Sequence, residues 1–204
     1  MDVLPNFMAD TRSGTDDIEP QRPNERPYFL FVGRLERIKG LDDVIPAFAQ
    51  YEDADLLVIG DGEHGAELRR LGAGNPRVQF LGRVAVDDLA PYYRHAIALI
   101  VPSVGYETFG MTVIEAFSHG TPVVARRIGP LPELIQESGA GELFETVPEL
   151  LAALRALQSS PTRRAEWGGA GRRAFTRRWS ESAVVPRFLE LVERARAKRA
   201  ARPH

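Results

Sequence analysis

The chain has 204 residues, a length that suits one compact α/β domain or one domain with a helical tail. Hydrophobic residues make up 44% of it, which supplies a sizeable core and disfavours a disordered chain. The absence of cysteine excludes disulfides, thiolate metal sites and cysteine nucleophiles. No stretch approaches the ~18 apolar residues of a membrane span, and residues 1–10 lack the basic and apolar regions of a signal peptide, so we expect a cytoplasmic protein.

The net charge of −2 conceals an uneven distribution. Residues 161–204 contain 12 Lys/Arg against 4 Asp/Glu, whereas residues 1–160 contain 14 against 24. A solvated, arginine-rich helix face explains the basic tail, and a weak contact with an anionic membrane surface, with peripheral attachment there, is the alternative. We expect no nucleic-acid binding, because the arginines are not interleaved with the aromatic side chains of a single-strand binding groove.

Segments of strand and helix length alternate after residues 9–27, a polar stretch with three prolines that indicates a linker or loop. The expected strands are Tyr28–Val32, Leu56–Ile59, Val78–Leu81, Ile97–Val101 and Pro122–Ala125. The expected helices are residues 41–48, Glu63–Leu71, Asp87–His95 and Thr112–Ser118, and a further short helix and strand lie within Leu131–Phe144. Apolar strands that alternate with helices predict a parallel sheet covered on both faces.

The later part of the chain has a helical pattern. Thr146 and Glu149 have the spacing of a capping box, Ser160-Pro161 can begin a second helix, and Ser180 can cap a last one. We expect Pro46 and Pro91 in the first turns of their helices, where a missing N–H is tolerated.

The segment Gly33–Gly40 directly follows the first strand, at the strand end where open α/β sheets bind ligands. Gly33 lets the backbone turn sharply and approach a ligand. Arg34 can form paired hydrogen bonds with phosphate oxygens, and Lys39 can add a positive charge. Two cations on one loop suggest a diphosphate site, and two solvated surface charges are the alternative.

The segment Glu107–Glu115 runs from a loop into a helix that begins near Gly110. The free N–H groups of residues 109–112 therefore point out of the helix N-terminus and suit an anion or sugar hydroxyls. Glu107 and Glu115 can hold different parts of one ligand, because a carboxylate matches two vicinal hydroxyls of a ribose or a hexose. A helix-surface glutamate is the alternative for Glu115, and its apolar neighbours disfavour that interpretation.

Two short motifs close the second and third strands. They are Gly60-Asp61-Gly62 and Gly82-Arg83-Val84. The preferred interpretation of each motif is a turn, and the alternative is that it lines a nucleotide pocket.

In this order, the motifs resemble the C-terminal domain of the group 1 retaining glycosyltransferases of GT-B fold. The resemblance is carried by Gly33–Gly40, Gly60–Gly62, Phe80–Val84, Pro102-Ser103, Glu107–Ala116 and Gly120–Ala125. It implies a Rossmann-like three-layer α/β/α domain with a parallel sheet, followed by C-terminal helices. The chain is accordingly divided into an initial segment and loop (1–27), a nucleotide-sugar-binding domain (28–178), and a C-terminal helix with a basic tail (179–204).

The resemblance also implies roles for single residues. The implied catalytic residues are Arg34 and Lys39, on the diphosphate, and Glu107, on the transferred sugar. The implied substrate-binding residues are Gly33, Asp61, Arg83, Val84, Phe109, Gly110, Met111, Thr112 and Glu115. In this scheme Glu115 binds the ribose hydroxyls, and residues near Arg83 contact the base. The expected donor is a UDP or GDP sugar. No cofactor or metal ion is implied, because cationic side chains and a helix dipole take the place of the metal.

The sequence departs from the resembled family in length, since a complete member has a preceding domain that binds the acceptor. We therefore expect transfer of the sugar, with retention, to need a separate N-terminal acceptor domain, and a nucleotide-sugar-binding module without activity of its own is the alternative. A dinucleotide-dependent oxidoreductase is disfavoured because no Gly-x-Gly-x-x-Gly follows the first strand. His64, His95 and His204 stand outside these motifs and are expected at the surface, and His119 is expected to be structural or exposed.

Overall fold

The computed structural model describes residues 4–10 and 22–200. Its centre is a six-stranded, fully parallel sheet in the order β3-β2-β1-β4-β5-β6. The strands are β1 (Tyr28–Val32), β2 (Asp55–Ile59), β3 (Val78–Gly82), β4 (Leu99–Val101), β5 (Val123–Arg126) and β6 (Gly141–Phe144). The expected parallel sheet is confirmed.

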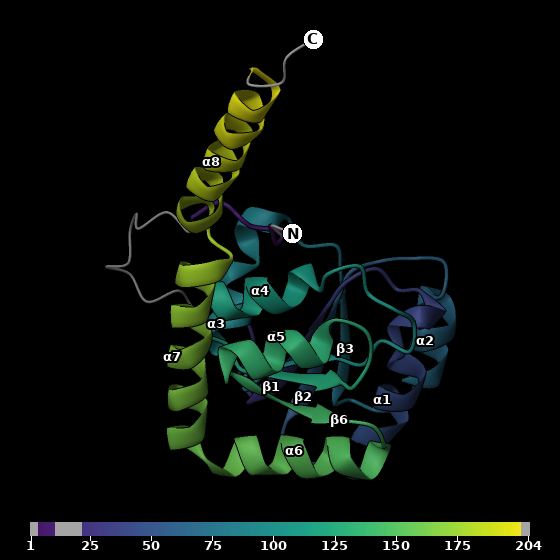
Figure 1. The fold of residues 1–204 in the computed structure, drawn as a ribbon. Coiled ribbons are helices and arrows are strands. Elements are labelled where there is room, and N and C mark those ends of the chain that lie inside the picture. Colours follow the sequence, from purple (N-terminus) through teal and green to yellow (C-terminus); the bar gives the residue numbers. More distant parts are fainter. Residues whose placement is uncertain (1–3, 11–21, 201–204) are drawn as a thin grey trace.

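Eight α-helices cover the sheet or extend from it in the described part of the chain (Figure 1). They are α1 (Leu41–Ala47), α2 (Gly65–Leu71), α3 (Ala90–His95), α4 (Met111–Ser118), α5 (Leu131–Ser138), α6 (Val147–Ser159), α7 (Pro161–Arg178) and α8 (Glu181–Ala200). Short 3-10 turns occupy Arg37–Lys39, Phe48–Gln50 and Val86–Asp88. None of these helices is long and apolar enough to cross a membrane.

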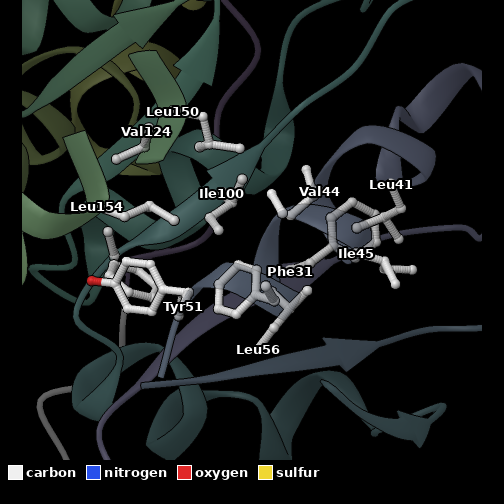
Figure 2. Close-up of a cluster of buried hydrophobic side chains, with 14 of the residues drawn as sticks. Phe31, Leu41, Val44, Ile45, Tyr51, Leu56, Ile100, Val124, Leu150 and Leu154 are labelled. Atoms are coloured by element: carbon white, nitrogen blue, oxygen red, sulfur yellow. The ribbon is translucent and has the colours of Figure 1, made fainter. Parts of the chain in front are cut away.

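Each face of the sheet has its own hydrophobic core, because successive strand residues point to opposite faces. Phe29 and Phe31 of β1 face one core, which α1 and α6 complete with Val44, Ile45 and Leu154 (Figure 2). The intervening residue Leu30 faces the other core, which is completed by side chains of α3, α4, α5 and α7. The sheet is therefore covered on both faces, as the alternating pattern predicts, in the three-layer α/β/α arrangement that the resemblance implies.

The last two helices extend the fold beyond these layers. In Figure 1, α7 rises along one side of the body, and α8 continues away from it. Phe188 and Leu189 of α8 are more than half exposed, whereas Val184, near the start of the helix, is buried.

The helix caps confirm several expectations and correct others. The Thr146–Glu149 capping box is formed, the Ser160 side chain accepts from the backbone N–H of Arg163, and the Ser180 hydroxyl accepts from the N–H of Ala183. Pro91 lies in the first turn of α3, as expected. The expectation for Pro46 was wrong, because α1 has only seven residues and Pro46 is the sixth, so that it lies in the last turn of the helix instead of the first.

Candidate functional site

The order of the sheet reverses between β1 and β4. β1 pairs with β2 on one side and with β4 on the other, so the loops that follow β1 and β4 diverge at the carboxyl edge. Open α/β sheets bind ligands in the crevice that such a reversal creates. A pocket of about 160 Å³ lies there. Its lining is Phe31, Val32, Gly33, Lys39, Ile100, Val101, Ser103, Glu107, Thr108, Gly110, Met111 and Thr112.

Close contact between the two loops builds one wall of this pocket. The carbonyl of Ile38 accepts hydrogen bonds from the N–H groups of Val104 and Gly105, at 2.9 and 3.2 Å. Gly40 has a φ of 72°, and a Cβ at this position would lie 2.1 Å from the carbonyl oxygen of Pro102. Only glycine permits both the left-handed backbone and this approach. The contact places Lys39 beside the loop that follows β4.

Lys39 and Glu107 form an ion pair inside the pocket. The Lys39 Nζ lies 2.7 Å from Glu107 Oε1, and the two side chains are 22% and 17% exposed. The buried Ser103 hydroxyl donates to the same carboxylate oxygen at 2.5 Å. Two donors thus hold one oxygen of Glu107. Sequence reasoning noted the Pro102-Ser103 motif but gave Ser103 no role, because nothing in the motif specifies which way the hydroxyl points.

The N-terminus of α4 forms the opposite wall. Gly110, with a φ of 92°, precedes the helix, and no side chain caps it. None of the described residues accepts a hydrogen bond from the N–H groups of Met111 or Thr112. Free amides at a helix N-terminus carry a partial positive charge and suit an anion. The pocket between the ends of β1 and β4 therefore combines these open amides with the ammonium group of Lys39, which is paired with Glu107. Because the amides suit an anion, we call it the anion pocket.

Arg34 lies outside the pocket lining. Its side chain is 79% exposed and forms an ion pair with Glu36 at 2.9 Å. The backbone of the preceding residue, Gly33, does line the pocket. The structure thus brings Lys39 and the α4 amides together and leaves the guanidinium of Arg34 in solvent at the same edge of the sheet.

Glu115 lies one helical turn beyond Thr112 and is half-buried. The hydroxyl of Tyr93 donates to Glu115 Oε2 at 2.7 Å. Burial raises the pKa of Glu115 above its usual range, and the hydrogen bond from Tyr93 acts in the opposite direction. Sequence reasoning did not single out Tyr93, because 22 positions separate it from its partner.

The two motifs at the ends of β2 and β3 lie side by side. The N–H of Gly60 donates to the carbonyl of Gly82 at 2.7 Å. Asp61 and Arg83 are exposed, and their charged groups are 3.9 Å apart. Val84 packs against the core on the α4 side of the sheet. Neither motif lines the anion pocket.

Phe109 packs against the same core and lines a second pocket, of about 490 Å³, formed with Leu4–Asn6, α5 and the junction of α7 with α8. Thr108 lines both pockets, so they are neighbours.

The expectation for His64 was wrong. His64 is buried, and its Nε2 lies 2.8 Å from Asp42 Oδ1. The turn before α2 packs against the loop that follows β1, where the N–H of His64 donates to the carbonyl of Leu35. His119 is structural, as expected: its ring stacks on Tyr93, with 5.3 Å between the centroids. His95 is half-buried, and His204 lies outside the described residues. Within residues 4–10 and 22–200, no group of three His, Asp or Glu side chains could hold a metal ion.

Comparison with known proteins places this geometry in a family. A family model described as "Glycosyl transferases group 1" matches residues 26–160. A sulfoquinovosyl transferase of Arabidopsis thaliana is 36% identical over 138 residues, which cover 65% of this chain and 27% of that protein. The chain spans between 27% and 47% of the length of curated relatives that it matches.

Solved structures agree with this match. A sucrose-phosphate synthase from Thermosynechococcus elongatus superposes with a TM-score of 0.77 and 28% identity, over 85% of this chain and 46% of that chain. The Anabaena protein HepE, solved in complex with UDP and glucose, gives a TM-score of 0.74 and 25% identity, over 82% of this chain and 48% of that chain. The chain therefore belongs to the group 1 glycosyltransferases, and its six-stranded parallel sheet has the Rossmann-like fold found in their GT-B structures.

Proposed function

We propose that this chain is the donor-binding half of a retaining glycosyltransferase and binds the diphosphate of a nucleoside-diphosphate sugar. The observation that carries the proposal is the pocket between the ends of β1 and β4, where Lys39 faces the open amides of α4. The neighbour HepE was solved with UDP and glucose, which supports a uridine nucleotide as the first donor to test.

Lys39 and the amides of Met111 and Thr112 would act on the leaving group. When the bond between the anomeric carbon and the diphosphate breaks, negative charge accumulates on the diphosphate oxygens. A preorganised ammonium and free N–H groups stabilise this charge without a metal ion. Arg34 would leave Glu36 and join them once a diphosphate is bound.

Glu107 would position the sugar. Lys39 and Ser103 both bond its Oε1, and no residue within 4–10 and 22–200 bonds its second carboxylate oxygen, which would accept from a sugar hydroxyl. Glu115 would take the ribose hydroxyls, and the segment Arg83-Val84 would meet the base.

The size of the pocket bears on what the chain does alone. Sites that enclose small molecules usually measure about 300–1,000 Å³. At about 160 Å³, the anion pocket can enclose only part of a nucleotide sugar. We therefore propose that a separate N-terminal domain completes the cleft, binds the acceptor and permits transfer to an acceptor hydroxyl with retained anomeric configuration.

Calorimetry with UDP, GDP and ADP sugars tests donor binding directly. We expect one donor to bind, to bind equally well with EDTA present, and to lose affinity in Lys39→Ala. Lys198→Ala is the matched control, because Lys198 is the only other lysine in the sequence and belongs to α8. This helix extends away from the body of the molecule (Figure 1). If no nucleotide sugar binds to the folded chain, the proposal is wrong.

A binding module without activity of its own is the second candidate, and the small pocket favours it for the isolated chain. A transfer assay with and without an acceptor-binding domain separates the two. Transfer that appears only with the added domain supports the enzyme, whereas donor binding without transfer under every condition supports the module.

A further inference from the structure

A buried tyrosine fixes the orientation of Glu115. Tyr93 is 1% exposed, and its hydroxyl donates to Glu115 Oε2 at 2.7 Å. Among the described residues, no other side chain bonds the Glu115 carboxylate. One carboxylate oxygen is thus held by Tyr93, and no residue in the described part of the chain donates to Oε1.

Tyr93 is itself held in place on several sides. Its ring stacks on His119, with an interplanar angle of 15°. The hydroxyl of the buried residue Thr121 donates to the Tyr93 carbonyl at 2.7 Å, and the Tyr93 side chain belongs to the core beneath α4. These contacts leave the Tyr93 hydroxyl almost no freedom, so it restricts the side-chain rotamers of Glu115.

The tyrosine also keeps its proton. Burial raises the pKa of Tyr93 well above 10, and the neighbouring carboxylate raises it further. The hydroxyl therefore remains a donor at every physiological pH, and it favours the ionised form of Glu115 against the effect of burial. An ionised carboxylate accepts hydrogen bonds only, which is what a ribose diol needs.

We propose that Tyr93 is a positioning residue for nucleotide recognition, which aims Glu115 so that the protein distinguishes a ribonucleotide from a 2′-deoxyribonucleotide. The proposal rests on the proposed function, since it assumes that Glu115 meets the ribose. Tyr93 does not touch the ligand in this scheme. It acts through the carboxylate: by holding Oε2 it fixes the direction in which Oε1 points toward the ribose.

The test is a comparison of ribose selectivity. Calorimetry measures the affinities of UDP, 2′-deoxy-UDP, GDP and 2′-deoxy-GDP for the 204-residue chain and for Tyr93→Phe. In the wild-type chain we expect the ribonucleotide to bind about tenfold or more tightly than its deoxy counterpart, because a hydrogen bond to a charged group is lost. In Tyr93→Phe we expect the ratio to fall to about two or three.

Tyr28→Phe is the matched control. Tyr28 is buried in the same core and donates its hydroxyl to the carbonyl of Tyr92 at 2.8 Å, without contacting Glu115. Both variants lose a buried tyrosine hydroxyl, so a general loosening of the core would change the two selectivities alike. We expect only Tyr93→Phe to change the ratio, and thermal melting confirms that each variant is folded.

The outcomes separate this proposal from the proposed function. If the wild-type chain binds none of the four nucleotides, both fail. If it binds them and the ratio is absent in the wild type, unchanged in Tyr93→Phe, or equally reduced in Tyr28→Phe, the role of Tyr93 is wrong while donor binding stands. Should Tyr93→Phe not fold, Glu115→Asp withdraws the same carboxylate from the tyrosine, and a retained ratio in that variant overturns the proposal.

Discussion

The ammonium group of Lys39 lies 2.7 Å from the carboxylate of Glu107, although 68 positions separate the two residues in the sequence. The pair forms because β1 and β4 are neighbours in the sheet and Gly40 lets their loops touch. It joins the residue proposed for the diphosphate to the residue proposed for the sugar, so each sets the position of the other.

Replacement of Lys39 should weaken the stabilisation of the leaving diphosphate more than replacement of Arg34. In an assembled enzyme we expect Lys39→Ala to lower turnover by about 10²–10³, as for the loss of one preorganised electrostatic contact. Arg34→Ala should lower it less, because Arg34 must first leave Glu36 and solvent. Steady-state kinetics with the preferred donor measures both, and normal turnover in both variants would refute the diphosphate assignment.

Gly40→Ala should destabilise the fold more than a glycine replacement of equal backbone strain elsewhere. Gly40 and Gly139 have φ values of 72° and 62°. A Cβ at Gly40 meets the Pro102 carbonyl, whereas a Cβ at Gly139 meets nothing within 4 Å. We expect Gly139→Ala to cost about 1 kcal/mol of unfolding free energy and Gly40→Ala at least about 2 kcal/mol. Equal losses in denaturant titrations would show that the two loops can separate without cost.

Asp55→Ala should be strongly destabilising, because Asp55 is a buried carboxylate. It is the first residue of β2, at the edge of the sheet opposite the pocket. It is 2% exposed and bonds the side chains of Asn24, Arg26, Arg77 and Gln79. Its removal leaves these donors without their shared acceptor, and we expect a loss of about 2–3 kcal/mol. Asp53→Ala, at an exposed position nearby, should change the unfolding free energy by no more than about 0.5 kcal/mol. A similar small change for both would mean that the Asp55 cluster adds nothing.

The stability of the protein should fall on mild acidification because of His119. Burial, reinforced by the cations of Arg94 and Arg172, lowers the pKa of His119 from 6.5 to about 4. Between these values the unfolded chain binds the proton and the folded chain does not, so the unfolding free energy decreases as the pH falls from 6.5 to 4. One such group contributes at most about 1.4 kcal/mol per pH unit.

His119→Leu should remove this contribution and flatten the pH dependence within that window. It should cost little near pH 7, because the buried Nδ1 of His119 has no hydrogen-bond partner among the described residues. Denaturant titrations at several pH values test this expectation, and parallel pH profiles for the two proteins would contradict it.

The sequence was sufficient to predict the sheet and most of the anion pocket. The apolar runs predicted the strands, and the glycines at positions 33 and 110 line the pocket beside the ends of β1 and β4. Lys39, Glu107 and the amides of Met111 and Thr112 were expected together, and the pocket lining unites them.

Features that depend on side-chain direction were not predictable. Arg34 lies on the loop that follows β1, as its position in the sequence predicts, but its guanidinium pairs with the carboxylate of Glu36 and stays in solvent. Ser103 and Tyr93 reach their glutamates across the fold, and a single sequence does not show such contacts. The burial of His64 likewise depends on how the turn before α2 meets the loop after β1.

The pairing of β1 with β4 has a consequence for folding. Strands β1 to β3 can assemble from one half of the chain and β4 to β6 from the other, because every other neighbouring pair of strands is consecutive in sequence. The two halves join when β1 pairs with β4. These strands are far apart in sequence, and contacts between distant segments form slowly. Ligand capture would therefore be the last property to emerge during renaturation, and a nucleotide that fluoresces on binding would report when the two halves have met.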